Sequence, residues 1–307
     1  MRYIFFKGGK VMKFWKKVLV FGLAACMCTG LLAGCGSSSE DTEEDTEAAE
    51  EAAEETEWAD DVQAIIDAGV LKVGVKNAVE GFGYQDTLTG EYSGMEIDLA
   101  TMIADYLGVE VEFTAVTAAT RTELLDSGDI DCVLATFTIT DERKESWDFT
   151  TAYYTDHVTV LVEQSSGITS LEDLVGTTVG VSSGSTSAKS LVEAMIDAGY
   201  ISGDNYDADT FDPATWTEDI SFQQYDDYPA ISTALSAGEV DAFCVDKSIL
   251  AIYNTDTRTY IEEEFAPQEY GVATTKGSGL SDLCEELITG WLEDGTIDGL
   301  IAEYGLE

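Results

Sequence analysis

The sequence predicts an α/β protein that folds as two lobes, each a mostly parallel sheet flanked by helices. The chain has 307 residues, which is more than a single domain of about 100–200 residues requires. Strand-like segments, in which apolar residues alternate with polar ones, are followed by segments with helical spacing of apolar residues. Such a succession of strands and helices is typical of parallel α/β sheets. The 12 Phe, 14 Tyr and 5 Trp residues are enough to build hydrophobic cores and exclude a fully disordered acidic chain.

The elements follow one another in two similar series. In the first series we expect strands at residues 70–75, 109–116 and 130–136, and helices at 99–107 and 121–127. Asp98 is predicted to cap the first helix and Gly108 to end it. The second series predicts a strand at 177–181, helices at 185–198 and 228–236, and a strand at 240–245. Residues 280–304 predict two helices that are separated at Gly295.

The charge composition excludes several classes of function. With 15 Lys and Arg against 60 Asp and Glu, the formal net charge of −45 would repel the phosphates of nucleic acids. The only histidine, His157, excludes sites that need two and has no nucleophile pattern nearby. Paired-cysteine, His-x-x-His and GxxxxGK patterns are missing from the sequence. We therefore predict neither catalysis, nor a metal, nor a cofactor.

The N-terminus has the pattern of an export signal. Six basic residues precede an apolar stretch at residues 18–27, which is too short to span a membrane. The following Leu31–Cys35 (LLAGC) resembles the bacterial lipobox, which implies a signal peptide at 1–34 and lipidation of Cys35 with diacyl chains such as palmitate. The alternative is a buried segment with an incidental cysteine. Residues 36–57 carry 11 acids and no cation, so residues 35–60 are predicted to form a lipidated, disordered tether.

The rest of the chain resembles a known family. The segments GEYSGMEIDLATMIADYLG, IDCVLATFTITDERKESWDFTTAYYT, TTVGVSSGSTSA and EVDAFCVDKSILAIY are similar, in this order, to the extracellular solute-binding proteins of family 3, the amino-acid receptors of ABC importers. The resemblance implies the two-lobe type II periplasmic-binding fold. Met95, where the family usually has an aromatic residue, and the long acidic segment 201–221 depart from the family pattern.

The same resemblance implies how the chain is divided. Lobe 1 would comprise residues 61–153 and 271–307, and lobe 2 residues 158–266. The chain would cross between them near 153–157 and 266–270. A continuous division, with a single cut near residue 165, is the alternative.

Binding residues are implied for both charged groups of an amino acid. Arg143 would hold the α-carboxylate as a planar fork, unless it only pairs with a neighbouring glutamate. Asp246 would hold the ammonium group, with the adjacent Lys247 as a competing partner. Further polar contacts are expected at the end of a lobe 1 strand and in a lobe 2 loop that leads into a helix, where free N–H groups favour an anion. These contacts are Ala135, Thr136, Thr138, Ser182, Ser185 and Thr186. A plain helix cap is the alternative for the lobe 2 loop.

Two further cations suggest which side chain is bound. Nine of the 15 cations remain after residue 34, and Lys76 and Arg121 would be the second and third at one pocket. Such a concentration fits a ligand with a second carboxylate, although ordinary surface pairing is the alternative. Phe82 would form a wall of the pocket or belong to the core.

These observations predict a lipid-anchored solute-binding protein on the outer face of the cytoplasmic membrane of a Gram-positive bacterium. It would act as a monomer, capture glutamate or aspartate, and deliver it to an ABC permease and its ATPase. The alternatives are a glutamine binder of the same class, a dehydratase-type enzyme on the same scaffold, and a ligand-sensing subunit.

Overall fold

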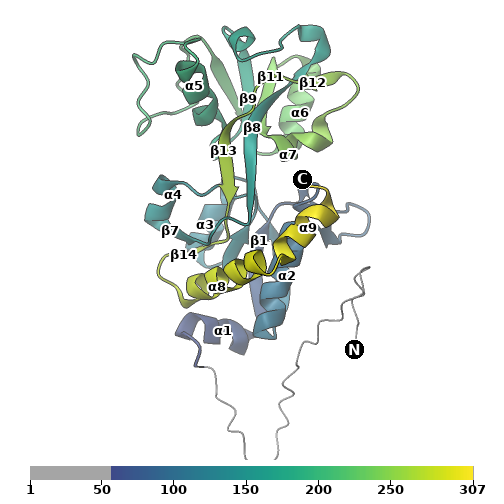
Figure 1. Cartoon of the computed structure of the whole chain (residues 1–307), viewed down its shortest axis with the longest axis vertical. Helices are drawn as coiled ribbons and strands as arrows, with labels where there is room; N and C mark the ends of the chain where they lie inside the picture. Colours follow the sequence, from purple (N-terminus) through teal and green to yellow (C-terminus); the bar gives the residue numbers. More distant parts are fainter. Residues whose placement is uncertain (1–56, 307) are drawn as a thin grey trace, which may run out of the picture. The chain divides into compact units, whose positions relative to one another are not determined.

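The structure is a computed structural model that describes residues 57–306. The predicted signal peptide, Cys35 and the tether as far as residue 56 lie outside these residues. The described chain forms two sheet-containing lobes (Figure 1). Within residues 57–306, every helix is too short or too polar to cross a bilayer.

The first lobe is built on a five-stranded sheet in the order β5-β1-β6-β14-β7. Its strands are β1 (Val70–Val75), β5 (Glu110–Ala115), β6 (Cys132–Leu134), β7 (Trp147–Phe149) and β14 (Ala273–Thr275). Its helices are α1 (Asp60–Ala68), α2 (Met95–Leu107), α3 (Thr120–Ser127), α4 (Asp141–Ser146), α8 (Gly279–Glu293) and α9 (Thr296–Tyr304). A small antiparallel sheet, which the sequence did not predict, contains β2 (Ala78–Val79), β3 (Gly83–Gln85) and β4 (Tyr92–Ser93).

The second lobe has a six-stranded sheet in the order β10-β9-β11-β8-β12, with β13 also paired to β8. Its strands are β8 (Tyr154–Glu163), β9 (Thr178–Ser182), β10 (Ser221–Tyr225), β11 (Ala242–Asp246), β12 (Arg258–Tyr260) and β13 (Phe265–Tyr270). Its helices are α5 (Ser187–Asp197), α6 (Tyr228–Ala237) and α7 (Lys247–Leu250), with 3₁₀ turns η1 (Gln164–Ser166), η2 (Glu172–Leu174) and η3 (Ala251–Tyr253).

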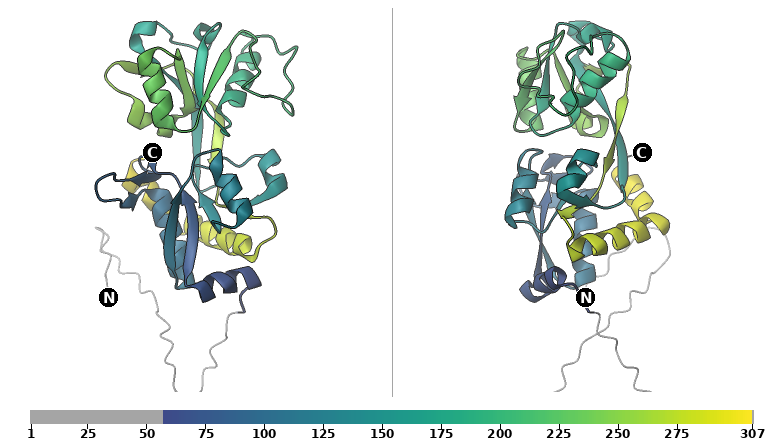
Figure 2. Two further views of the ribbon diagram at one scale, coloured as in Figure 1. Left: turned by 180° about the vertical axis from the view of Figure 1, so that it is seen from behind. Right: turned by 90° about the vertical axis from the view of Figure 1, so that its left-hand side faces the viewer.

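Strand direction follows the prediction in only part of each sheet. The trios β5-β1-β6 and β10-β9-β11 are parallel, whereas β7, β8, β12, β13 and β14 pair antiparallel. The reason is the path of the chain. β8 enters the second lobe and β13 returns from it beside β8 (Figure 2). The two strands pair antiparallel, with Tyr154 opposite Tyr270. Both segments that were predicted as crossings lie at this pair.

Helix α2 begins earlier than expected. It starts at Met95 after Gly94, which has a φ of 129° and is so close to the carbonyl of Phe82 that a Cβ could not fit. Asp98 is therefore not the N-cap, and its carboxylate instead accepts a hydrogen bond from the Tyr304 hydroxyl at 2.7 Å. The predicted end of the helix is confirmed, since Gly108 adopts a left-handed conformation there.

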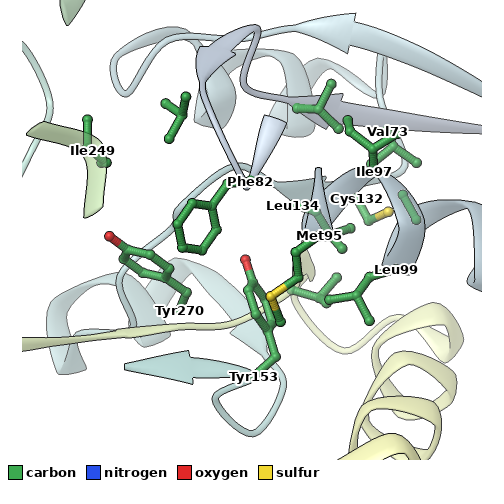
Figure 3. Packing of buried hydrophobic residues seen from close by; sticks show 14 of the residues in the cluster. Val73, Phe82, Met95, Ile97, Leu99, Cys132, Leu134, Tyr153, Ile249 and Tyr270 are labelled. Atoms are coloured by element: carbon green, nitrogen blue, oxygen red, sulfur yellow. The ribbon is translucent and has the colours of Figure 1, made fainter. Parts of the chain in front are cut away.

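The core of the first lobe reaches the crossing strands. Figure 3 shows Phe82 beside Tyr270, in the same cluster as Met95 and Leu99. The Phe82 ring lies 5.0 Å from that of Tyr154 and 5.7 Å from that of Tyr270, both edge-on. This aromatic packing fixes the position from which the crossing strands leave the first lobe.

Candidate functional site

A narrow polar pocket lies where residues of both lobes meet. Its volume is about 10 Å³, which is room for about one water molecule. The first lobe contributes residues that follow β5 and β6, and the second lobe contributes the start of α5, the start of α6 and the end of β11. The lining residues are Ala118, Arg121, Thr136, Thr138, Ser185, Thr186, Ser187, Tyr228, Val245 and Asp246.

Arg121 and Arg143 lie against the ring of Phe137. Their guanidinium carbons are 3.8 and 4.7 Å from the ring centre, so both contacts are cation–π interactions. Arg121 Nη1 donates to the carbonyls of Ala135 at 2.9 Å and Thr136 at 3.2 Å. Burial lowers the pKa of Arg121 to about 10 and that of Arg143 to about 9, so both remain cations at neutral pH.

Arg143 also connects the two lobes. Thr140 caps the short helix α4 by accepting a hydrogen bond from the Arg143 backbone N–H, and this fixes where the side chain starts. Arg143 Nη1 donates to the Thr138 carbonyl at 2.7 Å, and Nη2 donates to the Gly184 carbonyl of the second lobe at 3.1 Å. The alternative pairing with a neighbouring glutamate is not formed.

Lys76 follows β1 and is 4% exposed. Its Nζ atom lies 5.3 Å from the ring centre of Tyr228, on the opposite lobe. Burial, and to a lesser degree the nearby Arg121, lower the pKa of Lys76 to about 7. The ion pairs within residues 57–306 involve Lys247, Arg258 and Lys276. Lys76, Arg121 and Arg143 therefore have no carboxylate of this part of the chain in contact.

Glu96 is a buried acid beside these cations that the sequence analysis missed. Its Oε1 atom accepts hydrogen bonds from the Thr136 N–H and the Tyr153 hydroxyl, both at 2.6 Å. Burial raises the pKa of Glu96, while these bonds and the charge of Lys76 oppose the rise. Thr136 has a φ of 45°, which is rare for a β-branched residue. Glu96 therefore holds a strained peptide at the pocket.

Asp246 ends β11 at the pocket. It is 5% exposed and accepts a hydrogen bond from the Tyr270 hydroxyl. Burial, followed by the negative charge of Asp156, raises the pKa of Asp246 to about 7. The competing pair with Lys247 is not formed, because Lys247 pairs with Glu264 at the surface.

The loop before α5 is connected to the first lobe through Gln268 of β13. The hydroxyls of Thr138 and Thr186 both donate to Gln268 Oε1 at 2.8 Å, one from each lobe. The Ser182 carbonyl accepts from the backbone N–H of Ser185 at 3.1 Å and from its hydroxyl at 2.7 Å, which closes the turn. Gln268 was not predicted from the sequence.

The structure brings most of the predicted binding residues together. Arg121, Thr136, Thr138, Ser185, Thr186 and Asp246 line the pocket, and Lys76, Ala135, Arg143 and Ser182 lie next to lining residues. Phe82 is different. It is completely buried against Tyr154 and Tyr270, so it belongs to the core and not to the pocket wall.

Several polar atoms of the lining have no hydrogen-bond partner among the described residues. They are Arg121 Nε, Thr136 Oγ1 and Ser187 Oγ, all buried. Buried polar groups are almost always paired in folded proteins, so three exceptions around one pocket need an explanation. Donors left unpaired between two lobes are what a site for a small polar solute requires.

Two sheet lobes that are joined by crossing strands and share a polar pocket define a solute-binding protein. The chain belongs to the bacterial extracellular solute-binding proteins, family 3, whose profile matches residues 71–307.

Relatives and solved structures agree with this family. The ABC transporter glutamine-binding protein GlnH of Bacillus subtilis is 31% identical over 94% of this chain and 97% of its own length. The glutamine-binding protein of Geobacillus stearothermophilus is 32% identical over 85% of this chain and 93% of its own. The structure of an ancestral arginine-binding protein bound to arginine superposes with a TM-score of 0.64 and 31% identity, covering 77% of this chain and 98% of that one.

Proposed function

We propose that this protein is a receptor that captures one free amino acid between its lobes for an ABC importer. One observation carries the proposal. A guanidinium of the first lobe (Arg143) and a carboxylate of the second lobe (Asp246) flank one pocket that both lobes line. An α-carboxylate would take the place of the Thr138 carbonyl as an acceptor from Arg143 while the bond to Gly184 stays, and the ammonium group would pair with Asp246. Each charge of the ligand would then have a partner of opposite charge, without which its desolvation would be prohibitive.

For the side chain of the ligand, we propose a second carboxylate, as in glutamate or aspartate. Lys76 and Arg121 are buried basic residues without a contacting carboxylate, and Arg121 Nε is an unused donor. A distal carboxylate would supply the missing partner. Glutamine is the second candidate, because its amide oxygen could accept from the same donors and because two of the relatives are named as glutamine-binding proteins.

The cellular setting belongs to the same proposal. Lipidation at Cys35 would hold the protein on the outer face of the cytoplasmic membrane of a Gram-positive cell, with residues 35–60 as the tether. Lobe 1 (residues 61–153 and 271–307) and lobe 2 (residues 158–266) would close on the ligand, and the closed monomer would dock on a permease with its ATPase. We expect no turnover of the ligand, in contrast to a dehydratase.

The test is calorimetric titration of the twenty amino acids into the chain without its signal peptide, followed by glutamate and glutamine titrations of variants. Arg143→Met should abolish binding of both, since the α-carboxylate is common to them. Lys76→Met should weaken glutamate binding by about 30-fold or more, as expected when one partner of a buried charge pair is lost, and should affect glutamine much less.

Two further variants make the comparison sharper. Arg121→Met should resemble Lys76→Met with an added loss for both ligands, because Arg121 also holds the carbonyls of Ala135 and Thr136. Lys72→Met, which removes a partly exposed cation of β1 that is not a lining residue of the pocket, serves as the control and should change neither affinity. Equal losses for glutamate and glutamine in Lys76→Met would make glutamine the ligand.

A further inference from the structure

A second buried carboxylate, which is not one of the predicted binding residues, lies near Asp246 and shares a contact with it. Asp156 belongs to β8 at the crossing between the lobes and is 6% exposed. The hydroxyl of Tyr270, on β13, contacts both acids. It donates to Asp246 Oδ2 and lies 3.4 Å from Asp156 Oδ2. Asp156 also accepts hydrogen bonds from the backbone N–H and the hydroxyl of Ser248, at the start of α7.

This arrangement places two carboxylates around one hydroxyl proton. Tyr270 can donate to one acid at a time, so it does not neutralise the repulsion between the two carboxylates. Two adjacent acids in a low-dielectric site are poorly stable when both are ionised, and one of them tends to keep a proton. Asp156 accepts hydrogen bonds from Ser248 and from the backbone N–H of His157 at 2.8 Å, whereas Asp246 accepts one from Tyr270. The proton therefore belongs on Asp246.

The groups that face Asp246 come from several elements. On the second lobe and the crossings they are Asp156, Tyr228, Cys244 and Tyr270, and from the first lobe they are Arg121 and Arg143, with Lys76 across Tyr228. The two arginines favour the ionised form of Asp246, but burial and Asp156 outweigh them and bring its pKa to about 7. Tyr228 and Tyr270 stay neutral, because burial raises the pKa of each hydroxyl far above neutral pH.

We propose that Asp156 is a positioning residue for the ammonium group of the ligand, and that its negative charge, beside the Tyr270 hydroxyl that contacts both acids, keeps a proton on Asp246 until the ligand arrives. When the ammonium group of the ligand binds, Asp246 loses its proton to solvent, no covalent bond to the ligand forms, and the ammonium keeps all three of its own protons. The inference rests on the proposed function, in which Asp246 receives the ammonium.

The consequence is an affinity that depends on pH. The ligand requires ionised Asp246, so binding is strongest above pH 7 and weakens as the pH falls. Well below the pKa of Asp246, the dissociation constant should rise about tenfold for each pH unit, and close to one proton should be released per ligand bound. Without the charge of Asp156, the pKa of Asp246 falls, so this dependence moves to a lower pH.

The experiment is titration calorimetry of the chain without its signal peptide, from pH 5.5 to 8, in pairs of buffers with different ionisation enthalpies. Glutamine is the main probe, because a second carboxylate, as in glutamate, would also draw a proton onto Lys76. Glutamate is titrated in parallel, and its smaller net release reports that uptake. Wild type should release a proton to the buffer and bind glutamine at least tenfold more weakly at pH 5.5 than at pH 7.5.

Three variants separate the proposed role from a structural one. Asp156→Asn should release fewer protons and lose less affinity between pH 7.5 and 5.5 than wild type. Tyr270→Phe removes a donor that stabilises ionised Asp246, so it should move the dependence to a higher pH. Ser248→Ala removes a hydroxyl donor from Asp156 and so makes a proton on Asp246 less favoured; it should move the dependence to a lower pH, as Asp156→Asn does, but by less.

The outcomes distinguish this inference from the function on which it rests. A chain that binds neither glutamine nor glutamate nor any other amino acid refutes the proposed function and the inference with it. Amino-acid binding without proton release refutes the inference alone, as does a pH profile of Asp156→Asn that matches wild type. If Asp156→Asn does not fold, a Ser248→Ala profile that matches wild type refutes it equally.

Discussion

Replacing Gly184 with alanine should weaken closure of the lobes without damaging either lobe. Gly184 has a φ of 75° and lies in the loop before α5, in the second lobe. A Cβ atom at this position would lie 2.9 Å from the Ala118 carbonyl oxygen and 2.9 Å from Ala119 Cα, both backbone atoms of the first lobe. Backbone cannot rotate away as a side chain can, so the lobes must separate slightly.

The size of the effect follows from the contacts that this separation weakens. The Gly184 carbonyl accepts the hydrogen bond from Arg143 Nη2 across the lobes. A hydrogen bond to a charged group contributes about 1.5–3 kcal/mol. We therefore expect Gly184→Ala to weaken amino-acid binding by about 10- to 100-fold. The left-handed φ adds about 1–2 kcal/mol of strain, but the open and closed forms share it, so it lowers stability and not affinity.

A matched control separates the two effects. Gly199 also lies in the second lobe and has a φ of 77°, yet a Cβ there would meet nothing within 4 Å. Gly199→Ala should lower the melting temperature of the ligand-free protein about as much as Gly184→Ala does, while its affinity for amino acids stays at the wild-type value. Calorimetric titration and thermal melting measure both quantities. Equal affinities in the two variants would refute the reasoning that closure brings Gly184 onto the first-lobe backbone.

Two other predictions concern stability and anchoring. Arg258→Met should lower the free energy of unfolding by about 3–5 kcal/mol in denaturant titrations, because Arg258 is 5% exposed and its loss strands the carboxylate of Glu163, 2.9 Å away. The matched change Lys247→Met breaks only an exposed pair with Glu264 and should cost at most about 1 kcal/mol; similar losses in both variants would contradict this ranking. Cys35→Ser should move the protein from the membrane fraction to the soluble fraction, because two acyl chains are needed for stable anchoring, and a variant that stays with the membrane would rule out Cys35 as the anchor.

The spacing of apolar residues and glycines predicted those helices and strands whose ends depend on neighbouring residues in the sequence. The strand at 70–75 matches β1 at both ends, and the break at Gly295 between α8 and α9 is confirmed. The start of α2 was wrong because Met95 and Glu96 extend its buried stripe beyond Asp98. The direction of the antiparallel strands, such as β8 and β14, depends on where the chain leaves and re-enters a lobe, and periodicity contains no information about this.

In the candidate site, too, some residues could be predicted from the sequence and others depend on the tertiary fold. Asp246 ends β11 and Arg143 lies in the first turn of α4, and both stand in segments that resemble the family, so sequence reasoning could find them. Gln268 and Asp156 lie on the crossing strands, and only the tertiary fold brings them to the pocket. Glu96 could have been found, since it precedes Leu99 by three residues and Ile103 by seven and thus shares their buried face.

The Phe137 ring is contacted by the guanidinium groups of both Arg121 and Arg143, and these contacts affect the entropy of solute binding. A free arginine side chain has about 2 kcal/mol of rotamer entropy, which it loses when it is immobilised. Arg121 and Arg143 are already held by the ring and by backbone carbonyls before any solute arrives. That entropy is lost when the chain folds, so it does not reduce the affinity for the solute. The binding entropy should therefore reflect mainly the solute, its displaced water and the motion of the lobes.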